Sequence, residues 1–110
     1  MALTEINSYP KIYNLGHLEI ESLFEDTVLV QEKVDGSQFS FGFIEDKFKC
    51  RSRGKDQSPP LTDKMFERAV ESVCKLPLRD GWVYRGEYLE KPKHNALNYS
   101  RIPKNHVVLF

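Results

Sequence analysis

The chain has 110 residues, 40% of them hydrophobic, and a formal net charge of zero. This length limits it to one domain, at the small end for enclosing a nucleotide. The cysteines lack metal or redox spacing, no apolar run approaches ~20 residues and nothing resembles a secretory leader, which predicts a cytoplasmic protein without a membrane partner.

The charge is unevenly distributed along the chain. Residues 1–32 carry six acidic side chains and one basic side chain, whereas residues 33–110 carry fifteen basic and ten acidic ones. We therefore expect an anionic ligand to meet the C-terminal two thirds. A solvated charged surface would explain the same distribution.

The apolar patterns predict an α+β domain with an antiparallel β-sheet and one main helix. Residues 1–26 are expected to be an irregular lead-in with short helical or extended pieces. The β-branched run at 27–33 and the alternating runs at 38–44 and 47–53 predict a three-stranded antiparallel meander, with a turn at 45–46.

The second half of the chain contains the predicted helix. A loop is expected at 54–60, where a glycine and two prolines oppose regular structure. Helical spacing of apolar side chains then predicts an amphipathic helix at about 62–75, with Met65 and Phe66 in the core. The elements expected after the helix are a turn at 80–81, a strand at 82–89, a polar basic loop at 91–104 and a strand at 106–110.

The segment Lys33-Val34-Asp35-Gly36 suggests chemistry. The predicted strand before it would place a primary amine at a strand end, and a glycine permits the chain reversal that follows. Such an amine suits nucleophilic attack on phosphorus. Three more groups follow in order: Ser52-Arg53-Gly54, Arg85-Gly86-Glu87-Tyr88-Leu89, and the stretch 91–110, KPKHNALNYSRIPKNHVVLF.

In this order, the four groups resemble motifs I, Ia, III and IIIa of the covalent nucleotidyltransferases, and most closely the ATP-dependent RNA ligases of the T4 RNA ligase-like family. The resemblance covers about residues 28–110, and the stretch 91–110 is its most specific part. It implies that residues 1–110 form part of an ATP-grasp-like adenylation domain. The parent enzyme would seal RNA 5′-phosphate and 3′-hydroxyl ends through a lysyl-AMP intermediate, using ATP and Mg²⁺ or Mn²⁺. The implied location is cytoplasmic, of phage or bacterial type.

The resemblance also implies roles for single residues. Lys33 would be the nucleophile, Asp35 would organise its loop, and Gly36 would lie beside the nucleotide. Glu87 would bind the ribose or hold a metal ion through water; alternatively, it forms a salt bridge with a neighbouring arginine. Arg53 would contact the ribose or a phosphate, or else be a surface arginine.

Other implied contacts flank these positions. Backbone groups at Gln31 and Glu32 would read the adenine edge, and Phe110 would stack on adenine unless it packs in the core. Gln38 stands where DNA ligases and capping enzymes usually have arginine, which favours the RNA ligases. Contacts to RNA or phosphate, or else simple solvation, are expected for the basic residues Lys55, Lys91, Lys93, Arg101 and Lys104.

Lysine attack requires the neutral amine, although an isolated lysine loses its proton only near a pH of about 10.4. Neighbouring cations favour the neutral form. The cations expected beside Lys33 are Arg51, Arg53, Lys55 and Arg85.

Motifs IV and V of the family are absent from the sequence. The resemblance therefore predicts a truncated domain that exposes apolar surface and self-associates. Three other interpretations stay open. They are a non-catalytic nucleotide- or RNA-binding module, a DNA ligase or GTP-dependent capping-enzyme relative, and a small β-rich domain with coincidental motifs.

Overall fold

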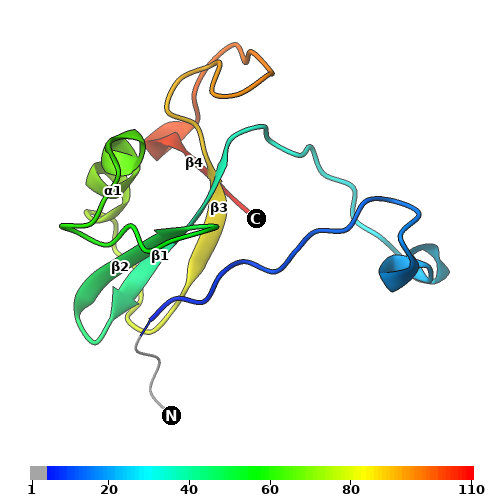
Figure 1. Ribbon diagram of the computed structural model, residues 1–110, viewed down its shortest axis with the longest axis horizontal. Coiled ribbons are helices and arrows are strands. Elements are labelled where there is room, and N and C mark those ends of the chain that lie inside the picture. The colour runs from blue at the N-terminus through cyan, green and yellow to red at the C-terminus, as the bar shows by residue number, and fades with distance from the viewer. Residues whose placement is uncertain (1–4) are drawn as a thin grey trace.

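The computed structural model describes residues 5–110 (Figure 1). Its centre is a four-stranded antiparallel sheet with the strand order β2-β1-β3-β4, so the predicted α+β class with an antiparallel sheet is confirmed. The strands are β1 (Ser37–Ile44), β2 (Lys47–Ser52), β3 (Tyr84–Tyr88) and β4 (Val107–Leu109).

A tight hairpin joins β1 to β2. Its two turn residues, Glu45 and Asp46, both have positive φ, at 52° and 64°. Positive φ at both central residues is the type I′ geometry, whose twist matches that of the paired strands. Ile44 consequently pairs with Lys47, and the predicted turn and its two flanking strands are confirmed.

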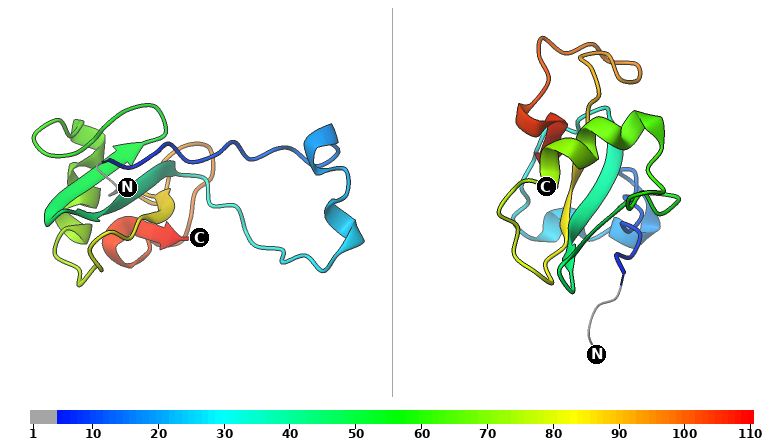
Figure 2. Two further views of the ribbon diagram at one scale, coloured as in Figure 1. Left: turned by 90° about the horizontal axis from the view of Figure 1, so that it is seen from below. Right: turned by 90° about the vertical axis from the view of Figure 1, so that its left-hand side faces the viewer.

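The hydrophobic core lies between one face of the sheet and the α-helix α1 (Glu67–Val73), which covers that face in both views of Figure 2. Alternation along β1 directs Phe39 and Phe41 towards the helix, and both are buried. The Phe39 ring stacks on Phe66 at a centroid distance of 5.6 Å. Burial of an aromatic side chain of this size contributes roughly 1.5–3 kcal/mol, so these contacts are a substantial part of what holds the helix on the sheet.

The helix is shorter than the predicted range 62–75. A 3₁₀ turn, η3 (Lys64–Phe66), precedes α1, which ends at Val73. Pro77 prevents the helix from continuing through Leu76, because the residue before a proline is disfavoured in helical conformation.

Residues 27–33 form no strand, so the predicted three-stranded meander is wrong: β1 and β2 are a two-stranded hairpin. The β-branched run has the composition of a strand, but β1 already pairs with β2 on one side and β3 on the other. Leu29 and Val30 are consequently 82% and 87% exposed.

Residues 10–32 form an arm that leaves the sheet and returns to it (Figures 1 and 2). Two short 3₁₀ turns, η1 (Leu18–Ile20) and η2 (Leu23–Glu25), interrupt the arm, in agreement with the irregular lead-in predicted for this region. None of residues 7–33 is buried, so few packing contacts hold the arm. Within residues 5–110, no helix has the length and apolar character needed to cross a membrane.

The C-terminal part follows the predicted order of elements with small shifts. β3 is shorter than the predicted strand at 82–89, because Trp82 lies outside the ladder. The loop after β3 contains one isolated bridge, between Lys93 and Asn98, and ends in the 3₁₀ turn η4 (Lys104–His106). β4 then pairs antiparallel with β3.

Candidate functional site

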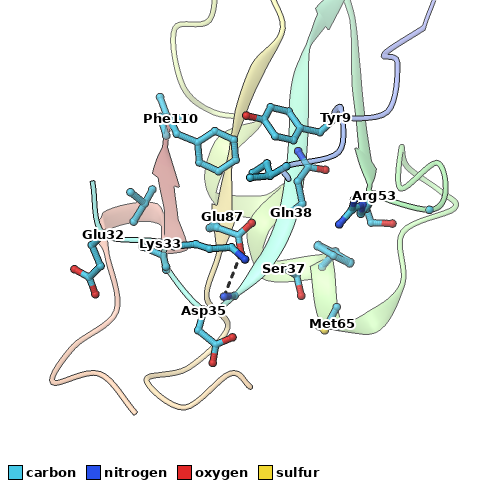
Figure 3. A pocket seen from close by; sticks show the side chains of 18 of the residues that line it. Tyr9, Glu32, Lys33, Asp35, Ser37, Gln38, Arg53, Met65, Glu87 and Phe110 are labelled. Atoms are coloured by element: carbon cyan, nitrogen blue, oxygen red, sulfur yellow. Dashed lines mark hydrogen bonds between the residues drawn. The ribbon is translucent and has the colours of Figure 1, made fainter. Parts of the chain in front are cut away.

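A cavity of about 1550 Å³ opens beside the start of β1, as Figure 3 shows. This volume exceeds the ~300–1,000 Å³ of common small-molecule sites, so the cavity is large enough for a mononucleotide. Its walls come from segments that are far apart in the sequence. They are the two ends of the arm, the turn before β1, the connection between β2 and α1, residue Glu87 of β3, and the C-terminal residues 108–110.

Lys33 and Glu87 lie on the same side of this cavity (Figure 3). Glu87 projects from β3, and its Oε2 accepts a hydrogen bond from the backbone N–H of Gly36 at 3.1 Å. Burial raises the pKa of Glu87, and the Gly36 hydrogen bond and the positive charge of Lys33 partly offset this effect. Lys33 and Glu87 thus interact electrostatically, although they do not form a direct ion pair.

Glu87 also forms no ion pair with an arginine, so the predicted alternative of an arginine salt bridge is wrong. Arg85 lies two residues before Glu87 and therefore on the same face of β3, but it binds other partners. Its guanidinium donates hydrogen bonds to the Ser40 hydroxyl and to the Asn7 carbonyl. The Glu87 carboxylate is therefore left facing the cavity.

The carboxylate of Asp35 is turned towards the loop after β3. Its Oδ2 accepts hydrogen bonds from the backbone N–H groups of Leu97 at 2.8 Å and Ala96 at 2.9 Å. These bonds, with that from Leu97 the stronger influence, lower the pKa of Asp35. The backbone N–H of Asp35 in turn donates to the Tyr99 hydroxyl at 2.8 Å. The side chain thus joins the turn before β1 to the loop.

Gly36 is required by close packing and not by an unusual backbone angle. Its φ is not positive, so the chain reversal expected there does not explain the glycine. A Cβ atom on Gly36 would instead overlap the carbonyl oxygen of Tyr88. The absence of a side chain therefore allows the start of β1 to approach the end of β3.

Phe110 and Arg53 lie at the rim of the cavity. Phe110 is 53% exposed, so the alternative of core packing is wrong. Its ring lies 5.1 Å from the ring of Tyr9, at an angle of 59°. The side chain of Arg53 is exposed and lines the cavity, while its carbonyl oxygen accepts a hydrogen bond from Ser8. Gln31 and Glu32 also line the cavity and are exposed.

The structure separates most of the other predicted basic residues from the cavity. Lys55 lines it, but its ammonium forms an ion pair with Asp63 at 2.8 Å. Arg51 and Arg85 are not neighbours of Lys33, because both bind backbone carbonyls of the N-terminal segment. Four further basic residues are exposed and do not line the cavity: Lys91, Lys93, Arg101 and Lys104.

Met65 and Tyr9 are among the residues of the cavity wall that were not expected there. Met65, predicted to be in the core, is 39% exposed and faces the cavity because the helix begins with a 3₁₀ turn. Tyr9 reaches the cavity because the preceding Ile6 is buried and its carbonyl accepts a hydrogen bond from Arg51. The helical spacing that includes Met65 predicted a core position for it, and Tyr9 stands in a segment without periodicity, so neither could have been assigned to the cavity from the pattern alone.

The described residues provide a divalent ion with one carboxylate of the cavity and not with a complete set of protein ligands. Among residues 5–110, no group of three or more His, Cys, Asp or Glu side chains could hold a metal ion by itself. Mg²⁺ commonly retains water and binds one or two carboxylates together with substrate phosphates. Glu87 fits that arrangement, since its carboxylate faces the cavity.

Comparisons of the chain with protein-family models, with curated proteins and with solved structures found no match.

Replacing Gly36 by alanine tests the close approach of β1 to β3. We expect Gly36→Ala to destabilise the protein by about 1–3 kcal/mol, because the new methyl group must displace the Tyr88 backbone. Gly54→Ala is the matched control, since nothing lies within 4 Å of the added atom. Urea unfolding measures both variants, and equal stabilities would contradict the packing argument.

Acidification tests the link between Asp35 and the loop. The folded-state pKa of Asp35 is depressed, so its contribution is present above its ordinary value of 3.8 and is lost as pH falls through the folded-state pKa. We expect hydrogen-exchange protection of the Ala96 and Leu97 amides to fall in this range. Asp35→Asn should lower the protection at neutral pH and remove its pH dependence, whereas Asp26→Asn in the arm should leave it unchanged.

Glu87→Gln tests the burial of the Glu87 carboxylate. Because the folded-state pKa is raised above 4.5, the folded protein binds more protons than the unfolded chain in this window, and stability falls as pH rises through it. Glutamine cannot ionise but still offers an oxygen to Gly36. We expect Glu87→Gln to be more stable than the wild type near neutral pH and to lose this advantage at acidic pH. Glu25→Gln in the arm should show no such trend in urea unfolding.

Proposed function

We propose that this chain is the nucleotide-binding part of an ATP-dependent RNA ligase in which Lys33 receives AMP. One observation carries the proposal: the four motif-like groups, although separated in sequence, all contribute to one cavity (Figure 3). Lys33, Arg53, Glu87 and Phe110 represent the four groups there. Coincidental motifs would have no reason to converge in space.

The proposed reaction begins with attack of the neutral Lys33 amine on the α-phosphorus of ATP. The N–P bond forms, the bond from that phosphorus to the bridging oxygen breaks, pyrophosphate leaves and the amine proton passes to solvent. AMP then moves from Lys33 to an RNA 5′-phosphate, and an RNA 3′-hydroxyl displaces AMP to join the ends. The covalent intermediate divides one difficult condensation into easier steps.

The residues around Lys33 suit this sequence of steps. The Glu87 carboxylate faces the cavity and is held by Gly36, which places an acceptor for a ribose hydroxyl at a fixed position. A divalent ion carried by the ATP phosphates and held through water by Glu87 would neutralise charge on the phosphates. Arg53 offers a guanidinium at the rim for the same anionic groups.

The aromatic wall suits the base of the nucleotide. The exposed ring of Phe110 offers a flat apolar face, and its tilted contact with Tyr9 limits how the ring can turn. Stacking of a base on an aromatic side chain contributes about 1–3 kcal/mol. The exposed backbone of residues 31–33 borders the same cavity and offers peptide groups to the base edge.

A non-catalytic nucleotide-binding module is the second candidate, and the charge of the cavity favours it. The basic residues that line the cavity within the described chain are Lys33, Arg53 and Lys55, and Asp63 neutralises the last of these. Acidic side chains of the same lining include Glu32 and Glu87. Such a balance suits a nucleoside or monophosphate better than a triphosphate.

Intact mass spectrometry after incubation with ATP and Mg²⁺ tests the proposal. We expect the wild type to gain the mass of one adenylate and Lys33→Ala to gain none. Lys11→Ala, which removes an exposed amine of the arm that does not line the cavity, should behave as the wild type.

Three results would redirect the assignment. An adenylate on Lys33→Ala would remove Lys33 as the nucleophile. Transfer from GTP in place of ATP would favour a capping-enzyme relative. Binding of AMP without any gain in mass would favour the non-catalytic module.

A further inference from the structure

The middle of the loop after β3 holds the turn that follows Lys33. Residues 94–99 hydrogen-bond the backbone N–H and the carboxylate of Asp35 and the backbone carbonyl of Gly36. The contacts run from Leu97 N and Ala96 N to Asp35 Oδ2, from Asp35 N to Tyr99 Oη at 2.8 Å, and from Asn95 Nδ2 to Gly36 O at 2.8 Å.

His94 connects the loop to the end of β3 and to the start of β1. Its Nδ1 accepts a hydrogen bond from the backbone N–H of Glu90 at 3.0 Å, which leaves Nε2 to carry the proton of the neutral ring. Nε2 lies 2.8 Å from the Ser37 hydroxyl, at the first residue of β1. The loop is therefore fixed to the end of β3 and to the beginning of β1.

Lys33 has no comparable support from its own side of the chain. None of residues 7–33 is buried, and residues 27–33 belong to no strand. The fixed point nearest to the amine is Asp35, two residues later, where the loop hydrogen bonds begin. The direction in which Lys33 enters the cavity thus depends on the loop.

We propose that residues 94–99 are the positioning element for Lys33, with Asn95 and Tyr99 as positioning residues. The part of this inference that concerns nucleophilic attack depends on the proposed function; the part that concerns the orientation of the amine does not. It also gives the uncharged centre of the loop a role separate from that of its basic residues. Lys93 and Arg101 lie outside the hydrogen-bonded centre and remain free for an anionic partner.

Two pairs of variants of the full chain test the proposal. Asn95→Ala removes the donor to Gly36, and Asn98→Ala in the same loop is its control, because the Asn98 side chain forms no hydrogen bond with any of residues 5–110. Tyr99→Phe removes the acceptor of the Asp35 amide, and Tyr13→Phe in the arm is its control.

Three measurements are made on each variant. Hydrogen exchange measures the protection of the Asp35 and Gly36 amides. Competitive acetylation followed by peptide mass spectrometry measures the reactivity of Lys33 relative to Lys11. Single-turnover adenylation at varied ATP separates the rate of adenylation from the affinity for ATP. We expect Asn95→Ala and Tyr99→Phe to increase exchange, to change the relative acetylation of Lys33, and to slow adenylation about ten-fold or more at saturating ATP with little change in the ATP concentration for half-maximal rate.

The outcomes separate the two proposals. If the wild type gains no adenylate, the proposed function fails, while a changed relative acetylation of Lys33 in both variants would still support the positioning role. If Asn95→Ala and Tyr99→Phe alter amide exchange but leave the acetylation of Lys33 at the control level, the loop is only structural and the positioning proposal is overturned. Equal behaviour of each variant and its control in all three measurements would overturn it as well.

Discussion

The backbone contact between Gly36 and the end of β3 is the constraint on which the site depends. The Gly36 N–H donates to Glu87, and its Cα lies so close to the Tyr88 carbonyl that no side chain fits between them. This contact sets the pairing of Ser37 with Tyr88 at the start of the ladder. It also brings Glu87 to the side of the cavity on which Lys33 lies. Loss of the contact would separate the two residues on which the proposed chemistry depends.

The domain combines a packed body with a weakly held arm, and the cavity lies where they meet. Phe39 and Phe66 are buried between sheet and helix, whereas the arm has no buried residue between 7 and 33. Segments with few buried apolar contacts open most easily, so the arm is expected to have a lower local stability than the sheet. The cavity wall formed by Gly36, Glu87 and Phe110 belongs to the body or its margins, and the wall formed by Ile12 and Leu29 belongs to the arm.

Secondary-structure elements whose signals lie within their own residues were predicted correctly. The strand that needed a neighbouring strand to pair with was predicted wrongly. The alternation around Phe39 and Phe41 and the turn at Glu45-Asp46 lie within the hairpin itself, so its signals are local. The hairpin is found where the sequence predicted it. The run at 27–33 has equally good strand composition, but the predicted meander required it to pair with β1, and both edges of β1 are occupied by β2 and β3. Pattern alone cannot report whether an edge is vacant.

The same limit applied to the candidate site. Lys33, Arg53, Glu87 and Phe110 were predicted as cavity residues from their motif-like surroundings, and all four line one cavity. Tyr9 could not be predicted, because its place depends on the burial of Ile6.

The loop within the stretch 91–110 separates its charged side chains from the residues that hold the turn before β1. Its basic side chains suggested contacts with RNA or phosphate, yet Lys91, Lys93, Arg101 and Lys104 do not line the cavity, and the hydrogen bonds to the turn come from uncharged residues between them. Because the centre of the loop is fixed to Asp35 and Gly36, its basic flanks adjoin a segment that is attached to the turn before β1. Electrostatic contacts of this kind supply affinity without sequence specificity. Under the proposed function, a polyanion bound along these flanks would be connected to the turn that follows Lys33 through the hydrogen bonds of the loop centre.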